Sequence, residues 1–185
     1  TSGGYVNDRA DYQPCLSGSG GQGIMLLGKI LAQAAMLEGK FVTWLPAYGA
    51  EVRGGTAHCM VVISDAEIGS PYIDKAETLI IMNQPSLLRF ANRLEKGGLL
   101  IINSSIVKTE EYTSSLKYPF TDIAVELGNV KVANMVALGA YLAKKKTVSL
   151  KNILKVMKMM APSGRGDILE INQKALNKGA GLKDG

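Results

Sequence analysis

A chain of 185 residues is long enough for one globular domain with a substantial hydrophobic core. Apolar residues make up 46% of the chain and charged residues 20%, which excludes an intrinsically disordered protein. Two cysteines, Cys15 and Cys59, are too few for a four-cysteine iron–sulfur or zinc site, and their wide spacing favours a reducing, cytoplasmic compartment. The single histidine, His58, excludes a two-histidine metal site.

The net charge of +5 is unevenly distributed. Residues 1–130 carry 10 Lys/Arg and 13 Asp/Glu, a net −3, and residues 131–185 carry 11 and 3, a net +8. The basic part could face a phosphate ligand, an acidic partner or a nucleic acid, or could be a solvated surface. Nucleic acid is not expected, because Tyr141 is the one aromatic side chain there that could stack on bases. No apolar run is long enough for a membrane span, and residues 1–9 lack the apolar region of a signal peptide.

The first elements alternate between strand and helix, which is typical of an α/β layer fold. A first strand is expected over residues 11–17, although Pro14 weakens it or marks an edge or a bulge. The spacing of apolar residues then predicts a helix over residues 24–37, and Gly39 is a suitable stop signal for it.

The same alternation continues to the end of the chain. The apolar run 60–63 suggests a strand that is buried on both faces, and Gly97 and Gly98 are expected to end a helix that contains Leu87 and Leu94. Further strands are expected at 41–45, 56–64, 78–82, 99–102 and the start of 118–126. Further helices are expected at 132–142, 150–160 and 168–176.

These elements predict three segments. Residues 1–9 are expected to be a disordered or expression-derived N-terminus, and residues 10–160 an α/β domain. Residues 161–185 are expected to form a linker and a C-terminal helix that packs on the domain or on a partner.

A glycine-rich segment matching G-x-G-x-x-G separates the first expected strand from the first helix. Its residues are Gly18, Ser19, Gly20, Gly21, Gln22 and Gly23. Glycines permit a tight turn there and let backbone amides approach a diphosphate at the positive end of the helix. An NAD site also needs an acidic residue at the end of the second strand, where the sequence FVTWL has none. An ordinary NAD site is therefore disfavoured, and close packing of helix on strand without a ligand remains the alternative.

A second unusual segment, PAYGAEVRGGT at 46–56, places an arginine and an acid among glycines. Arg53 could clamp a phosphate or carboxylate, and Glu51 could orient Arg53 or form a mere surface ion pair with it. Asn83 is a candidate N-cap whose position could also present amides to a ligand. His58 is expected to form a local hydrogen bond rather than act in catalysis, and Cys59 to be a core residue.

Five motifs follow one another in an order that resembles a known family. They are SGSGGQGIMLLGKILAQAA, WLPAYGAEVRGGTAHCMVVIS, MNQPSLLRF, GGLLIINSS and ELGNVKVANMVALGA. They resemble the gamma subunit of 2-oxoacid:ferredoxin oxidoreductases over roughly residues 15–176, most closely the 2-oxoglutarate type and then the branched-chain type. The resemblance implies a three-layer α/β/α fold with a mostly parallel or mixed sheet and a Rossmann-like glycine turn after the first strand.

The resemblance also implies that the chain works inside a complex that converts a 2-oxoacid to acyl-coenzyme A and passes electrons to ferredoxin. Alpha and beta subunits would carry thiamine diphosphate, and a ferredoxin-like subunit would carry iron–sulfur clusters. This chain would contribute coenzyme A binding and subunit contacts, with no catalytic residue or metal ligand of its own. The residues expected to contact coenzyme A are Gly18, Ser19, Gly20, Gly21, Gln22, Gly23, Tyr48, Glu51, Arg53, Gly54, Gly55 and Asn83.

Alone, the chain is expected to be inactive and could form a homodimer through a surface meant for a partner. A stand-alone nucleotide-binding dehydrogenase and a purely structural interaction module are the alternative functions.

Overall fold

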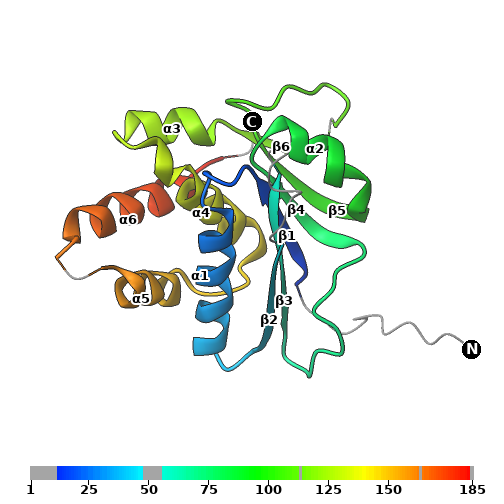
Figure 1. Ribbon diagram of the computed structural model, residues 1–185, viewed down its shortest axis with the longest axis horizontal. Helices are drawn as coiled ribbons and strands as arrows, with labels where there is room; N and C mark the ends of the chain where they lie inside the picture. Colours follow the sequence, from blue (N-terminus) through cyan, green and yellow to red (C-terminus); the bar gives the residue numbers. More distant parts are fainter. Residues whose placement is uncertain (1–11, 48–55, 113, 163, 184–185) are drawn as a thin grey trace, which may run out of the picture.

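A computed structural model of the chain describes residues 12–47, 56–112, 114–162 and 164–183. A six-stranded sheet separates two unequal layers of helices (Figure 1). Its strands, in chain order, are β1 (Pro14–Gly18), β2 (Phe41–Ala47), β3 (Ala57–Ser64), β4 (Ala76–Ile81), β5 (Leu94–Asn103) and β6 (Leu116–Tyr118). The expected α/β/α fold with a mixed sheet is therefore confirmed.

The strand order in the sheet is β2-β3-β1-β4-β5-β6. Strands β1, β4, β5 and β6 are parallel to one another, and β3 is antiparallel to both of its neighbours, β2 and β1. The carboxyl ends of the parallel strands therefore meet the amino end of β3 at one edge of the sheet, which we call the carboxyl edge. Gly18 of β1 is paired there with Ala57 of β3.

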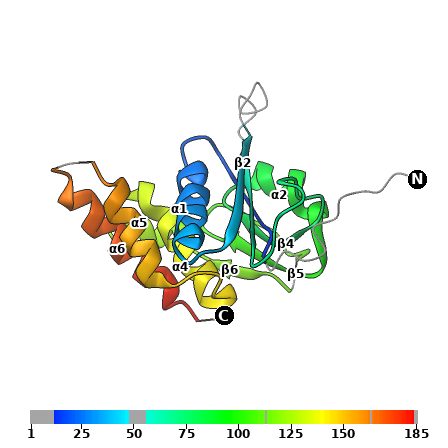
Figure 2. The same ribbon diagram turned by 90° about the horizontal axis from the view of Figure 1, so that it is seen from below.

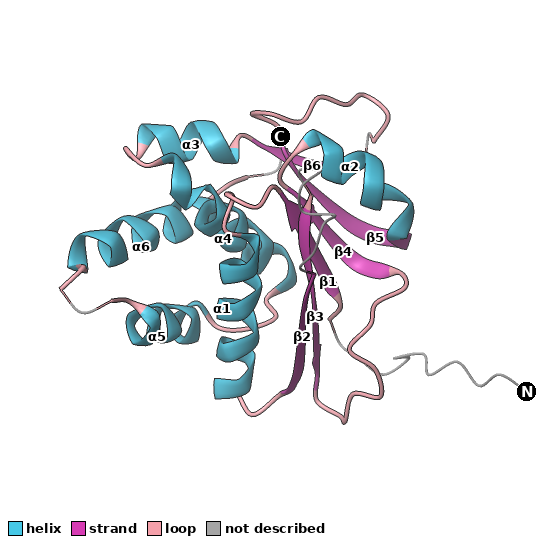
Figure 3. Ribbon diagram, in the orientation of Figure 1, coloured by secondary structure: helices cyan, strands magenta, loops and turns pink. Residues whose placement is uncertain are grey.

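The helices are α1 (Ile24–Leu37), α2 (Gln84–Phe90), α3 (Phe120–Glu126), α4 (Ala133–Lys145), α5 (Leu150–Met160) and α6 (Gly166–Ala180). Helices α1 and α4 lie against one face of the sheet, with α5 and α6 outside them, whereas α2 covers part of the other face (Figures 1 and 2). Figure 3, coloured by secondary structure, shows the same arrangement of the helices around the sheet. None of the described helices is long and apolar enough to cross a bilayer.

Each face of the sheet has its own hydrophobic core, because side chains alternate along the strands. On β1, Leu16 joins the core under α1 and α4, and Cys15 joins the core under α2. On β3, Val61 and Met60 alternate in the same way, which confirms the prediction that this run is buried on both faces. Each leucine fully buried in such a core contributes about 1.5–3 kcal/mol to folding.

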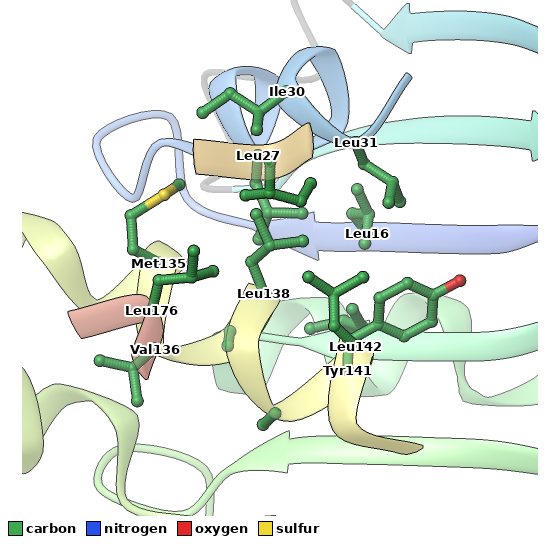
Figure 4. Packing of buried hydrophobic residues seen from close by; sticks show 14 of the residues in the cluster. Leu16, Leu27, Ile30, Leu31, Met135, Val136, Leu138, Tyr141, Leu142 and Leu176 are labelled. Atoms are coloured by element: carbon green, nitrogen blue, oxygen red, sulfur yellow. The ribbon is translucent and has the colours of Figure 1, made fainter. Parts of the chain in front are cut away.

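The core under α1 and α4 depends on close approach between elements. Figure 4 shows Leu16 and Leu27 near Leu138 of α4. Farther out, α4 and α6 touch through their backbones: a Cβ atom on Gly139 would lie 2.1 Å from the carbonyl oxygen of Leu176, and one on Gly179 would lie 2.0 Å from that of Val136. Only glycine fits at such a crossing.

The helix α2 ends earlier than expected. It stops at Phe90, a 3₁₀ turn over Ala91–Arg93 follows, and β5 already begins at Leu94. Gly97 and Gly98 therefore lie inside a strand, and the prediction that they end the helix is wrong. The pairing of β4 with β5 shifts register here, and Gly97 has a positive φ of 81°, so these glycines accommodate an irregularity in the strand.

The ends of the chain differ from the prediction in smaller ways. Pro14 is the first residue of a central strand, a position where its missing N–H is tolerated. The last helix is longer than expected and extends to Ala180, packed on α4.

Candidate functional site

The carboxyl edge is held together by buried polar side chains. Ser17, at the end of β1, donates from its hydroxyl to the Ser86 hydroxyl at 2.9 Å, which ties β1 to α2. Asn103, at the end of β5, donates to the Met82 carbonyl at 3.3 Å and to the Thr121 hydroxyl at 2.9 Å. The end of β1 is thus tied to α2, and the end of β5 is tied to α3 and to Met82, which follows β4.

The glycine turn between β1 and α1 is closed by the Gln22 side chain. Gln22 Oε1 accepts from the Ser19 amide at 2.7 Å, and Gln22 Nε2 donates to the Met82 carbonyl at 3.0 Å. The Gln22 amide donates to the Ser19 carbonyl at 3.0 Å. Gln22 therefore braces the turn against the end of β4, and the Ser19 amide is already used inside the protein.

The glycines of the turn have different surroundings. A Cβ atom on Gly18 would lie 2.7 Å from Gln22 Oε1 and 2.9 Å from Met82 Cβ, so that position has no room for a side chain. Gly23 has a φ of 69°, which disfavours any other residue. A Cβ atom on Gly21, by contrast, would meet no atom of the described residues within 4 Å. Close packing therefore requires glycine at position 18, and the positive φ favours glycine at position 23. No contact with the described residues requires glycine at position 21.

Asn134, at the start of α4, holds the turn from the other side and was missed by the sequence reasoning. It is 3% exposed, and its Nδ2 donates to the Gly23 carbonyl at 3.1 Å. Its Oδ1 accepts from the Met135 amide at 2.9 Å. The available signal was an asparagine within the apolar stretch of a helix, because a buried amide needs a specific partner.

The amino end of α1 opens next to Gly21. Its N-cap is Gly23, which supplies no side-chain hydrogen bond, and the first turn holds no acidic residue. The amides of the first turn have no partner within the helix, and the helix dipole makes this end positive. These features suit a bound anion.

Five of the residues expected to contact a ligand, Tyr48, Glu51, Arg53, Gly54 and Gly55, lie outside the described residues. The residues that flank their loop are described: β2 ends at Ala47, β3 begins at Ala57, and Ala57 pairs with Gly18. The loop therefore starts and ends at the carboxyl edge. Asn83 caps α2, since its Oδ1 accepts from the Ser86 amide at 3.0 Å.

The two cysteines lie in the two cores. Burial raises the pKa of both Cys15 and Cys59 to about 12, so both remain protonated thiols at neutral pH. Cys59 is a core residue, as predicted. Within the described ranges, no three His, Cys, Asp or Glu side chains are grouped so that they could hold a metal ion. His58 is half-buried at the start of β3, with its ring 4.7 Å from that of Phe90.

Comparisons with known proteins give several matches that cover most of the chain. A family model described as pyruvate ferredoxin/flavodoxin oxidoreductase matches residues 14–182. The chain is 38% identical over 167 residues to ketoisovalerate oxidoreductase subunit VorA of Methanothermobacter marburgensis, a match that covers 89% of this chain and 35% of VorA. It thus spans about a third of the length of that relative.

Two other matches span nearly the full length of both proteins. The 2-oxoglutarate synthase subunit KorC of Methanocaldococcus jannaschii is 35% identical over 170 residues, which cover 89% of each chain. The solved gamma subunit of a keto/oxoacid ferredoxin oxidoreductase from Geobacter sulfurreducens is 30% identical, with a TM-score of 0.77, and the match covers 91% of this chain and 95% of that one.

Proposed function

Because the chain belongs to the pyruvate ferredoxin/flavodoxin oxidoreductase family, we propose that it is the gamma subunit of a 2-oxoacid:ferredoxin oxidoreductase complex. The complex would oxidatively decarboxylate a 2-oxoacid to its acyl-coenzyme A and pass the electrons to ferredoxin. Similarity to KorC over nearly the full length of both chains supports 2-oxoglutarate as the substrate. Similarity to VorA supports a branched-chain 2-oxoacid as the second candidate.

The contribution of this chain would be to hold coenzyme A at the glycine turn. The observation that carries this proposal is the open space at Gly21 beside the uncapped amino end of α1. A phosphate group there would accept hydrogen bonds from first-turn amides and would interact favourably with the helix dipole. Gln22 and Asn134 would keep the amides in place, because they fix the turn from opposite sides.

The remaining chemistry would come from other subunits. Thiamine diphosphate and iron–sulfur clusters, assigned to alpha, beta and ferredoxin-like partners, would supply decarboxylation and electron transfer. In support, both cysteines of this chain are buried, protonated core residues. Their free state also supports a reducing, cytoplasmic compartment.

Purification of the native protein from its own cells tests the partner assignment. We expect a thiamine-binding pair of chains and a small cluster-containing protein to co-purify, and the isolated chain to oxidise no 2-oxoacid. A chain recovered alone as a monomer or homodimer, with micromolar affinity for NAD(H), would instead support the stand-alone dehydrogenase.

The substitution Gly21→Ala in the assembled complex tests the coenzyme A assignment. The added methyl group meets no atom of the residues that the structure describes, so folding should be unaffected. We expect the KM for coenzyme A to rise about fivefold or more, equivalent to losing roughly one hydrogen bond, with the KM for the 2-oxoacid unchanged. Gly166→Ala, whose methyl group also points into open space, is the matched control. An unchanged KM for coenzyme A in Gly21→Ala would contradict the assignment.

A further inference from the structure

A cavity of about 450 Å³ lies on the opposite side of the sheet from α1, between β2, β3 and α2. None of the glycine-turn residues lines it. Its walls include an apolar side, formed by Leu45, Pro46 and Met60, and a basic side, formed by Arg89 and Arg93. Its volume lies within the range of about 300–1,000 Å³ that is usual for small-molecule sites.

The two arginines are held on one buried aromatic ring. The guanidinium carbon lies 5.3 Å from the centre of the Phe90 ring for Arg89 and 5.9 Å for Arg93, and Phe90 is 2% exposed. Each guanidinium also has a hydroxyl partner: Arg89 donates to Thr56 Oγ1 at 3.0 Å, and Arg93 donates to the Tyr72 hydroxyl. Arginines fixed in this way lose little conformational freedom when they bind a ligand.

The described lining of this cavity contains two arginines and no acidic residue. Arg93 forms no ion pair with any carboxylate of the described chain. Some other cations do have carboxylate partners: Lys40 pairs with Asp65 at 3.2 Å and Lys145 pairs with Glu77 at 2.5 Å.

We propose that this cavity is an anion-binding site, separate from the glycine turn, for a small molecule that carries a phosphate or carboxylate group on an apolar portion. The planar guanidinium groups of Arg89 and Arg93 bind the oxyanion, for which their geometry is suited. The apolar portion packs between Met60 and the β2 residues Leu45 and Pro46. Recognition here uses side-chain cations, whereas the glycine turn offers backbone amides.

The position of His58 makes the site directly observable. His58 lines the cavity and is the only histidine of the chain, so its ring signals in NMR spectra of the full chain need no assignment. Phenyl phosphate presents a phosphate group on a phenyl ring, and benzoate presents a carboxylate on the same kind of ring. Benzyl alcohol is the uncharged counterpart. We expect at least one of the two anions to shift the His58 ring signals in a saturable manner and benzyl alcohol to leave them unchanged.

The variants Arg89→Gln and Arg93→Gln locate the binding. Each is expected to weaken anion binding about tenfold or more, because a charge-assisted hydrogen bond is lost. Arg93→Lys should fall between Arg93→Gln and the parent chain, since it keeps the charge without the planar fork. Lys96→Gln, at an exposed cation of β5 outside the cavity, is the matched control and should bind normally.

Gly21→Ala separates this proposal from coenzyme A binding at the turn, because it should leave the His58 shifts intact whatever it does to coenzyme A. Anion binding that both arginine-to-glutamine variants retain would overturn the proposal. The absence of any saturable shift, or an equal shift with benzyl alcohol, would also overturn it.

Discussion

The two faces of the sheet are covered to very different depths. On one face, α1 and α4 pack on the strands, and α5 and α6 pack on them in turn (Figure 2). On the other, the seven-residue helix α2 covers only part of the sheet. Strand β2 shows the contrast within a few residues, since Trp44 packs into the core under α1 while Leu45, on the cavity side, is 38% exposed.

The two faces also differ in how closely they are packed. The face with two tiers of helices is packed so closely that backbones touch at Gly139 and Gly179. The thinly covered face keeps a cavity with Arg89 and Arg93 in its wall. In our proposals, the thickly covered face provides the rigid support, the thinly covered face carries the anion cavity, and the glycine turn holds coenzyme A at the carboxyl edge.

The largest effect is expected from filling the contact between α4 and α6. Gly139→Ala would place a methyl group about 2.1 Å from the Leu176 carbonyl oxygen, so the helices must separate. We expect the free energy of unfolding to fall by about 3 kcal/mol, measured by urea denaturation. Gly166→Ala, on α6 but facing open space, should change it by less than about 0.5 kcal/mol. If Gly139→Ala lowered the free energy of unfolding by less than about 1 kcal/mol, the contact between α4 and α6 would have to tolerate repacking.

A smaller effect should distinguish the two faces in the unmodified protein. Cys15 lies in the core under α2 and Cys59 in the core under α1, and burial raises the pKa of both thiols to about 12. Neither should react with an alkylating reagent until the structure opens locally. Because thin coverage makes opening easier, we expect Cys15 to be labelled about tenfold faster than Cys59 in native conditions. Mass spectrometry of labelled peptides measures both rates, and faster labelling of Cys59 would reverse the comparison.

The smallest effect concerns surface hydrogen bonds that join the end of α1 to the start of α5, on the face covered by two tiers of helices. Glu38, which follows α1, accepts hydrogen bonds from the Ser149 amide at 2.7 Å and from Asn152 Nδ2 at 2.9 Å. Partial burial acts to raise the pKa of Glu38, but these hydrogen bonds prevail and hold that pKa below its ordinary value of 4.5. A lowered pKa stabilises the fold above the ordinary value and loses that contribution as the pH falls through the folded-state pKa.

The variant Glu38→Gln tests the contribution of the Glu38 charge to these hydrogen bonds. Its unfolding free energy should be lower than that of the parent chain at neutral pH by less than about 1 kcal/mol, because the site is exposed to solvent. The difference should shrink as the pH falls below 4.5. A difference that is constant with pH would mean that the charge of Glu38 does not matter.

Local patterns in the sequence predicted much of the fold. The apolar period over 24–37 matches α1 at both ends, Asn83 caps α2 as expected, and the five motifs identified the family. These features depend on neighbours a few residues apart, so they can be read without knowing the rest of the fold. The beginning of β5 could not be read in this way, because the irregular pairing with β4 decides it.

The sequence by itself therefore determined the alternation of strands and helices, the place of the glycine turn and the family of the chain. Only the tertiary structure decided the antiparallel direction of β3, the role of Asn134, which lies 111 positions from Gly23, and the cavity that brings His58 beside Arg89 and Arg93. The physical reason is that these arrangements arise from contacts between segments far apart in the chain. Packing in three dimensions selects such contacts, and no local period or spacing encodes them.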